Sequence, residues 1–186
     1  RWGPLMGKDA DGTPLALAWI GGRPHGYNIE LLQLERTSDV DGALALAPTL
    51  GMPPQNLLVA DSAGHIGWTI AGNSIPLRED IDPLLPSDWS KPGSGWQGWA
   101  TPAHYPRIEN PADGRLWTAN NRTIDGAALA LLGNGGHDLG ARAQQIRDDL
   151  RGLASFTPGN LLDIQLDNRA LFLTRWQRLL QNTLAD

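Results

Sequence analysis

A strand–turn–strand pattern near the middle of the chain constrains the fold more than any other feature. An apolar run, Asn56–Asp61, is followed by Ser62-Ala63-Gly64 and then by a second apolar run, His65–Gly72. Two such runs on either side of a short glycine-containing turn are typical of a β-hairpin. The blades of a β-propeller recur every ~40–50 residues, and this hairpin has no second copy in the chain. The pattern therefore favours a single hairpin within a mixed fold.

A second hairpin is predicted at the N-terminal end, before a long region without regular structure. The runs Trp2–Met6 and Pro14–Trp19 flank Asp11-Gly12, a strong turn dipeptide. From Asn73 to Pro106 the chain is rich in proline, glycine and serine, which excludes long helices or strands there. Long loops of this kind usually carry function or wrap around another element.

Two helices are predicted between the hairpins. Asn28 is expected to cap the first, and either Ser38 or Asp39 the second, because their side-chain oxygens accept hydrogen bonds from the first turn. The second helix should end before Pro48. The expected buried side of the first helix carries Leu31, Leu32 and Leu34.

Helical periodicity dominates from Asp138 onward. Thr157-Pro158 predicts a helix start, with the threonine as N-cap and the proline at the first helical position. The residues expected to face inward recur at helical spacing: Ala143, Ile146 and Leu150 in one helix, and Leu171, Leu173, Trp176, Leu179 and Leu180 in a last helix over Asn168–Leu184. Residues 1–186 are therefore expected to form one α+β domain, with 1–135 mainly strands and long loops and 136–186 helical.

Composition excludes several classes of function. The 186 residues carry a formal net charge of −5 and no cluster of lysine or arginine, so we expect no nucleic-acid binding through phosphate contacts. No apolar run is long enough to span a membrane. The chain has no cysteine, which excludes disulfides and thiolate metal ligands.

Eight tryptophans, against two phenylalanines and two tyrosines, are an unusual aromatic content. A tryptophan-lined face that binds sugars is one interpretation. Packing of the indole rings within the fold, with each N–H finding an acceptor, is the favoured one.

The segment from Asn110 to Arg122 carries the strongest chemical signal. Asn110-Pro111-Ala112-Asp113-Gly114 predicts a turn, and Leu116–Ala119 a short strand that delivers Asn120 and Asn121 at its end. Adjacent neutral amides suit a polar strand terminus. They also suit hydrogen-bond donation to a developing oxyanion.

No complete catalytic apparatus is visible elsewhere. The four histidines show no metal-ligand spacing, and Gly93-Ser94-Gly95 lacks the pattern of a nucleophile elbow. Glu79, Asp80 and Asp82 could bind Ca²⁺, but a solvated loop is the favoured interpretation.

Seven motifs in order resemble the penicillin acylase (penicillin amidase) family of N-terminal nucleophile hydrolases, over nearly the whole chain. They are Arg1-Trp2-Gly3-Pro4, the hairpin from Asn56 to Gly72, Pro76 with Arg78, Gly95-Trp96-Gln97-Gly98-Trp99, Asn110-Pro111 to Asn121, Arg142-Ala143-Gln144-Gln145-Ile146, and Gln165 with Asp167.

The resemblance implies an antiparallel αββα sandwich, of which this chain would be a part, followed by helices. It implies that Asn120 is the oxyanion-hole asparagine and that Arg142 supports it, so the two should lie close together. The alternative is that Arg142 only pairs with a helix carboxylate such as Asp138. The resemblance assigns Asn121 no role.

In that family the nucleophile is the first residue of the processed large subunit. The resemblance places Arg1 inside that subunit, after the nucleophile, so the 186 residues are expected to be inactive alone. It implies no cofactor beyond a structural Ca²⁺ in the parent family. It also implies a periplasmic location and, as partners, a small-molecule amide substrate, the small (alpha) subunit and the rest of the large subunit. Unpaired strand edges further predict a homodimer or an aggregation-prone monomer.

Two functions remain open on these observations. The first is part of an amide hydrolase acting on β-lactam side chains or N-acyl homoserine lactones through an acyl-enzyme. The second is a tryptophan-rich binding or scaffold module without catalysis.

Overall fold

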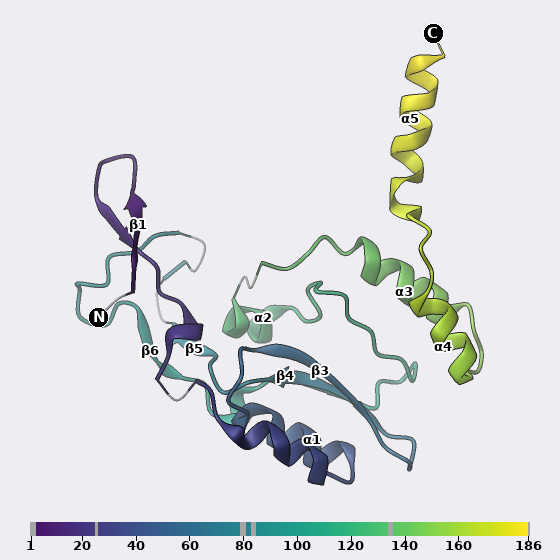
Figure 1. Cartoon of the computed structure of the whole chain (residues 1–186), viewed down its shortest axis with the longest axis horizontal. Coiled ribbons are helices and arrows are strands. Elements are labelled where there is room, and N and C mark those ends of the chain that lie inside the picture. The colour runs from purple at the N-terminus through teal and green to yellow at the C-terminus, as the bar shows by residue number, and fades with distance from the viewer. Residues whose placement is uncertain (1–2, 25, 79–80, 83–84, 134–135, 186) are drawn as a thin grey trace. The chain divides into compact units, whose positions relative to one another are not determined.

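The chain forms two compact units that combine helices and strands. The computed structural model describes residues 3–24, 26–78, 81–82, 85–133 and 136–185. The first unit comprises Arg1–Leu116 and Thr123–Gly136, and the second comprises Trp117–Arg122 and His137–Asp186. The mixture of helices and antiparallel strands confirms the expected α+β class (Figure 1).

The first unit is built on a three-stranded antiparallel sheet in the order β3-β4-β7. β3 (Gln55–Ala60) and β4 (Ile66–Ala71) form the predicted central hairpin, and β7 (Arg107–Glu109) pairs with the other edge of β4. β4 therefore has hydrogen-bonded neighbours on both sides and is the most deeply buried strand.

Both faces of β4 are covered. Trp68 and Ile70 point to one face, where they pack with Tyr105 and with leucines of α2 (Gly126–Leu132). Ala71 points to the opposite face and packs with Ala47 and Leu50, just beyond α1 (Val40–Leu46). Side chains of a strand alternate between faces, so a strand with helices on both faces carries apolar side chains on both. Figure 1 shows α1 below and α2 above β3 and β4.

The remaining elements of the first unit are short. β1 (Leu5–Lys8) and β2 (Pro14–Ala16) form the predicted N-terminal hairpin, although Trp2 lies outside the described residues. β5 (Pro76–Arg78) pairs with β6 (Trp96–Trp99) across the proline-rich region. The 3₁₀ helices are η1 (Ile20–Gly22), η2 (Ile29–Arg36), η3 (Ala47–Thr49) and η4 (Pro102–His104).

Local capping signals are confirmed at both predicted helices. The Asn28 side chain accepts from Glu30 N at 3.0 Å and from Gly51 N at 2.8 Å. Asp39 accepts from Gly42 N at 2.7 Å and begins α1. The first helix is wound as a 3₁₀ helix, however, and only Leu34 packs on the core.

The buried face predicted for that helix is wrong in part, since Leu31 and Leu32 are exposed. Residues three apart lie one above the other on a 3₁₀ helix, so Leu32 points about 120° away from Leu34 and off its face. Leu31 shares the face of Leu34, but it is not covered by the described residues.

The second unit is helical apart from the segment Trp117–Arg122. It contains α3 (Ala141–Arg151), α4 (Pro158–Gln165), the 3₁₀ helix η5 (Leu171–Leu173) and α5 (Thr174–Leu184). Ala143 and Leu150 are buried as expected. Among the described residues, no helix combines the length and apolar character that a bilayer crossing requires.

Two predictions about this region are wrong. The five side chains expected to face inward from the last helix are 47–61% exposed, because within the described chain nothing covers their apolar stripe: Leu171, Leu173, Trp176, Leu179 and Leu180. Leu116–Ala119 forms no strand either. The Ala119 amide donates to the Asn121 side chain at 2.9 Å, in a local turn contact, instead of to a neighbouring strand.

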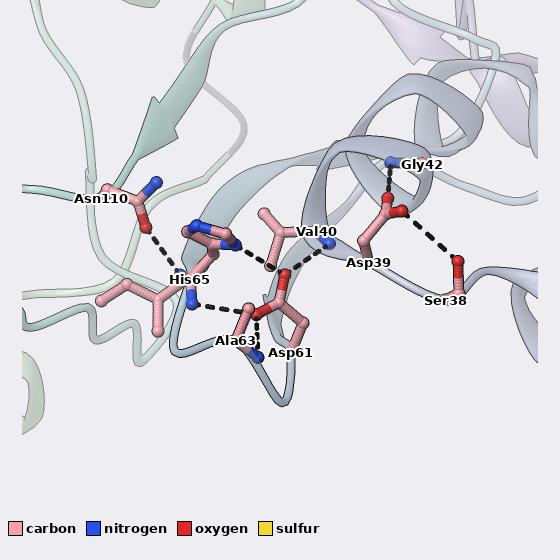
Figure 2. Close-up of polar contacts among 9 residues, drawn as sticks. Ser38, Asp39, Val40, Gly42, Asp61, Ala63, His65 and Asn110 are labelled. Atoms are coloured by element: carbon pink, nitrogen blue, oxygen red, sulfur yellow. Dashed lines mark hydrogen bonds and ion pairs between the residues drawn. The ribbon is translucent and has the colours of Figure 1, made fainter.

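Asp61 ties the central hairpin to the start of α1, as Figure 2 shows. Its Oδ1 accepts from Ala63 N and from His65 N, both at 3.0 Å, which closes the β3–β4 turn. Its Oδ2 accepts from Val40 N at 3.3 Å and lies 3.0 Å from the His65 ring. Burial alone would raise the pKa of Asp61, but the hydrogen bonds from His65 and Val40 lower it to about 2.

We therefore expect Asp61→Asn to destabilise the fold in a pH-dependent way. The pKa is lowered on folding from an ordinary 3.8 to about 2, so the carboxylate stabilises the folded state fully above about pH 4 and loses that contribution as the pH falls toward 2. In urea unfolding, the midpoint of the variant should lie below that of the parent at pH 6, and the gap should be clearly narrower at pH 2.5.

The matched control is Asp41→Asn, which removes a carboxylate from the first turn of α1. It should not reproduce the narrowing of the gap between pH 6 and pH 2.5. A gap for Asp61→Asn that is equally wide at pH 6 and pH 2.5 would show that the carboxylate charge has no part in joining the hairpin to α1.

Candidate functional site

Asn120 and Arg142 lie together in the second unit, as expected. Arg142 Nη2 donates to the Asn120 side-chain oxygen, Oδ1, at 3.1 Å. Asn120 belongs to the irregular segment Trp117–Arg122, and Arg142 lies in the first turn of α3. The predicted proximity of the two side chains is therefore confirmed.

The backbone conformation of Asn120 sets the direction of its side chain. Its φ is +61°, in the left-handed region that asparagine tolerates better than most residues. Its carbonyl oxygen accepts from Asp138 N at 2.8 Å, just before α3. The residue is thus held on its main chain by one hydrogen bond and on its side chain by another.

Arg142 contacts two further oxygens. Nη2 donates to the main-chain oxygen of Ala119 at 3.1 Å and to Oδ2 of Asp138 at 2.7 Å. The alternative partner, Asp138, is thus also used, and the carboxylate and the asparagine share one nitrogen. The hydrogen bond from Arg142 lowers the pKa of Asp138, so this carboxylate is ionised at neutral pH and pairs with the guanidinium.

This arrangement leaves the Asn120 amide oriented to donate. Arg142 has no acceptor atoms, so the atom of the asparagine that faces it is the oxygen. The amide nitrogen is the opposite end of the same planar group. Asn120 is exposed, and its NH₂ is available to an oxygen atom brought next to it.

Asn121 contributes to the shape of the segment. Its side-chain oxygen accepts from Ala119 N at 2.9 Å, and its side-chain nitrogen donates to Arg122 O at 2.9 Å. The adjacent asparagines therefore divide two tasks: Asn121 shapes the backbone turn, and Asn120 presents its amide. The sequence alone assigned no role to Asn121.

The contact between Asp138 and the Asn120 main chain was not predicted from the sequence. The spacing of Asp138 and Arg142, four residues apart before and within a helix, signals their ion pair. No sequence pattern signals that the Asp138 amide reaches back to Asn120, because that contact depends on the path of residues 121–137.

The tryptophans occupy several separate environments. Trp68 is buried and donates from Nε1 to Asn56 Oδ1 at 2.9 Å. Trp96 packs against Trp89 and Trp99, with ring centroids 5.5 Å apart in both pairs. The Arg23 guanidinium stacks 3.9 Å from the ring centroid of Trp99. Trp89, Trp96 and Trp99 are partly buried in this cluster, as the packing interpretation describes. Trp19 and Trp176 are 63% and 47% exposed, so that interpretation does not extend to every tryptophan.

The described residues contain no group of three or more acidic or histidine side chains placed to hold a metal ion. Glu79 and Asp80, two of the three carboxylates considered for Ca²⁺, lie outside the described residues.

Comparison with known proteins identifies the family. The family model described as penicillin amidase matches residues 1–186. The chain belongs to the penicillin amidase family. The acyl-homoserine lactone acylase QuiP of Pseudomonas aeruginosa is 30% identical over 149 residues, which cover 80% of this chain and 17% of that protein.

Two further relatives extend the comparison. QuiP of Pseudomonas fluorescens strain Pf0-1 is 36% identical over 91 residues, 49% of this chain and 11% of that protein. The penicillin acylase 2 proenzyme of Pseudomonas sp. strain SE83 is 27% identical over 126 residues, 67% of this chain and 16% of that protein. The chain thus spans less than one fifth of the length of these curated relatives.

We expect Arg142→Met to loosen the Asn120 turn. Methionine keeps the bulk of the side chain but loses all three hydrogen bonds from Nη2. Because the Asp138 amide is bonded to the Asn120 carbonyl, its hydrogen exchange should become faster by about tenfold, as expected for the loss of a local hydrogen-bonded contact.

The control is Arg147→Met on the same helix, since Arg147 pairs with Asp148 at 2.7 Å and not with Asn120. Its exchange rate at Asp138 should match the parent. Equal rates at Asp138 in the parent and in Arg142→Met would mean that Arg142 does not hold this turn.

Proposed function

We propose that this chain provides the oxyanion-stabilising part of a larger amidohydrolase. The observation that carries the proposal is the hydrogen bond from Arg142 to the Asn120 oxygen, which directs the Asn120 NH₂ outward. Membership of the penicillin amidase family supplies the reaction class. The nucleophile and its activating amine lie outside this chain in the proposed enzyme, so the 186 residues alone do not hydrolyse amides.

In the proposed reaction, the nucleophile attacks the carbonyl carbon of the substrate amide. The carbonyl oxygen becomes an oxyanion, and the Asn120 NH₂ donates a hydrogen bond to it. Collapse of the tetrahedral intermediate breaks the C–N bond, releases the amine with a proton and leaves an acyl-enzyme, which water then hydrolyses. Asn120 acts in both steps, because each passes through a tetrahedral intermediate.

The substrate class is taken from the relatives. The proteins named acyl-homoserine lactone acylase and penicillin acylase support an acylated amine, either an N-acyl homoserine lactone or a β-lactam with an acyl side chain. We further propose an αββα sandwich in the complete enzyme, a small subunit and the rest of the large subunit as partners, and a periplasmic location.

The test is Asn120→Ala in the complete gene product that contains this chain. Loss of one oxyanion-hole donor typically lowers kcat by ~10²–10³, and KM should change little because the donor acts in the transition state. The assay measures the free amine that is released when N-acyl homoserine lactones or penicillins are hydrolysed. Asn120→Asp should lose as much activity, because it keeps the shape of the side chain but has no NH₂ to donate.

Asn168→Ala is the control, since Asn168 is an exposed asparagine of the same compact unit. It should retain the parent kcat. Unchanged turnover in Asn120→Ala, in a protein that is processed normally, would contradict the oxyanion assignment. Absence of amide hydrolysis by the parent protein itself would favour the binding or scaffold alternative.

A further inference from the structure

Asp138 takes part in both of the interactions that hold Asn120, one on its main chain and one on its side chain. Its main-chain N–H donates to Asn120 O at 2.8 Å, and its Oδ2 accepts from Arg142 Nη2 at 2.7 Å. Its other oxygen, Oδ1, accepts from Leu139 N at 2.9 Å. One residue therefore holds the asparagine main chain directly and the asparagine side chain through the arginine.

Arg142 Nη2 has fewer hydrogens than oxygen partners, so the strongest of its contacts, with the Asp138 carboxylate, determines its position. This nitrogen carries two hydrogens but serves three oxygens, at 2.7 Å from Asp138, 3.1 Å from Ala119 and 3.1 Å from Asn120. A hydrogen bond between charged groups is shorter and stronger than one to a neutral oxygen. The carboxylate contact therefore sets the position of the nitrogen, and the two neutral oxygens adapt to it.

The position of Nη2 in turn affects how well Asn120 donates. An amide whose oxygen accepts a hydrogen bond is polarised, which strengthens donation from its NH₂. A guanidinium that moves away from Asn120 would free the amide to rotate and weaken that polarisation. Small displacements of catalytic groups can lower rates as much as a hundredfold.

We propose that Asp138 is a positioning residue for amide hydrolysis, which fixes Arg142 against the Asn120 side chain and anchors the Asn120 main chain. The inference rests on the proposed role of Asn120. It goes beyond that role because it assigns a function to the carboxylate, which does not contact the reacting atoms.

Because Asp138 and Arg142 are exposed, a role in positioning Asn120 can be distinguished from a role in stabilising the fold. The side chains of Asp138 and Arg142 are 52% and 59% exposed, and ion pairs this exposed contribute little to global stability. A positioning role predicts a loss of kcat without a loss of stability. A merely structural role predicts the reverse.

The experiment measures kcat, KM and the melting temperature of Asp138→Ala and Asp138→Asn in the complete gene product. Asp138→Ala should lower kcat by about 10- to 100-fold, the range expected when a catalytic group is misplaced, with KM and melting temperature near the parent values. Asp138→Asn keeps an oxygen that can accept from Arg142 and should recover part of the loss.

The matched control is Asp148→Asn. Asp148 pairs with Arg147 on α3 at 2.7 Å and is 53% exposed, so it has nearly the same exposure and pairing as Asp138 without any link to Asn120. It should leave kcat unchanged.

A double-variant comparison decides whether Asp138 acts through Asn120. In the Asn120→Ala background, Asp138→Asn should lower kcat no further, because the group that it positions is gone. This comparison also decides the matter if Asp138→Ala does not fold. The inference would be overturned if Asp138→Asn lowered kcat by the same factor in the parent and in the Asn120→Ala background. A parent-like kcat in both Asp138→Asn and Asp138→Ala would also overturn it.

The two proposals fail in different ways. If Asn120→Ala lowers kcat but the Asp138 variants behave like Asp148→Asn, the oxyanion role stands and the positioning role is wrong. If Asn120→Ala has parent activity, the proposed function itself is wrong.

Discussion

The hydrogen-bonded link between Asn120 and the beginning of α3 is the interaction on which the candidate site depends. Asn120 lies in a segment without helix or strand, and its backbone adopts a left-handed conformation. Asp138 N and Arg142 Nη2 bind its two oxygens. These two hydrogen bonds, from the main chain before α3 and from a side chain in its first turn, orient a residue that belongs to no helix or strand.

The first unit is organised around one strand, β4, that is buried on both faces. β4 pairs with β3 and β7 and packs apolar side chains against both α1 and α2. Asp61 then links the β3–β4 turn to the first helical amide of α1. Two main-chain amides of the turn and the first amide of the helix donate to the Asp61 carboxylate instead of to a main-chain acceptor. These hydrogen bonds stabilise the ionised form, which is why the pKa of Asp61 is low.

Features set by neighbouring residues could be predicted from the sequence, and features set by distant partners could not. The central hairpin, the Asn28 and Asp39 caps and the Thr157-Pro158 helix start each depend on a few adjacent residues. The seven-residue helix α2 follows a weak pattern, and its last carbonyls are bound by Arg78, some fifty residues earlier. The amphipathic pattern of α5 predicts a helix correctly but cannot say what covers its apolar stripe. At the site, the resemblance located Asn120 and Arg142, whereas the Asp138 amide contact required the folded path of the chain.

The most direct test is a crystal structure of the complete gene product with a boronate or phosphonate analogue of the tetrahedral intermediate bound to the nucleophile. We predict that the Asn120 side-chain nitrogen lies about 2.7–3.1 Å from the oxygen that represents the oxyanion, with the Asn120 oxygen still bonded to Arg142. An analogue oxygen bound by other donors, with Asn120 turned away from it, would contradict the assignment of this site.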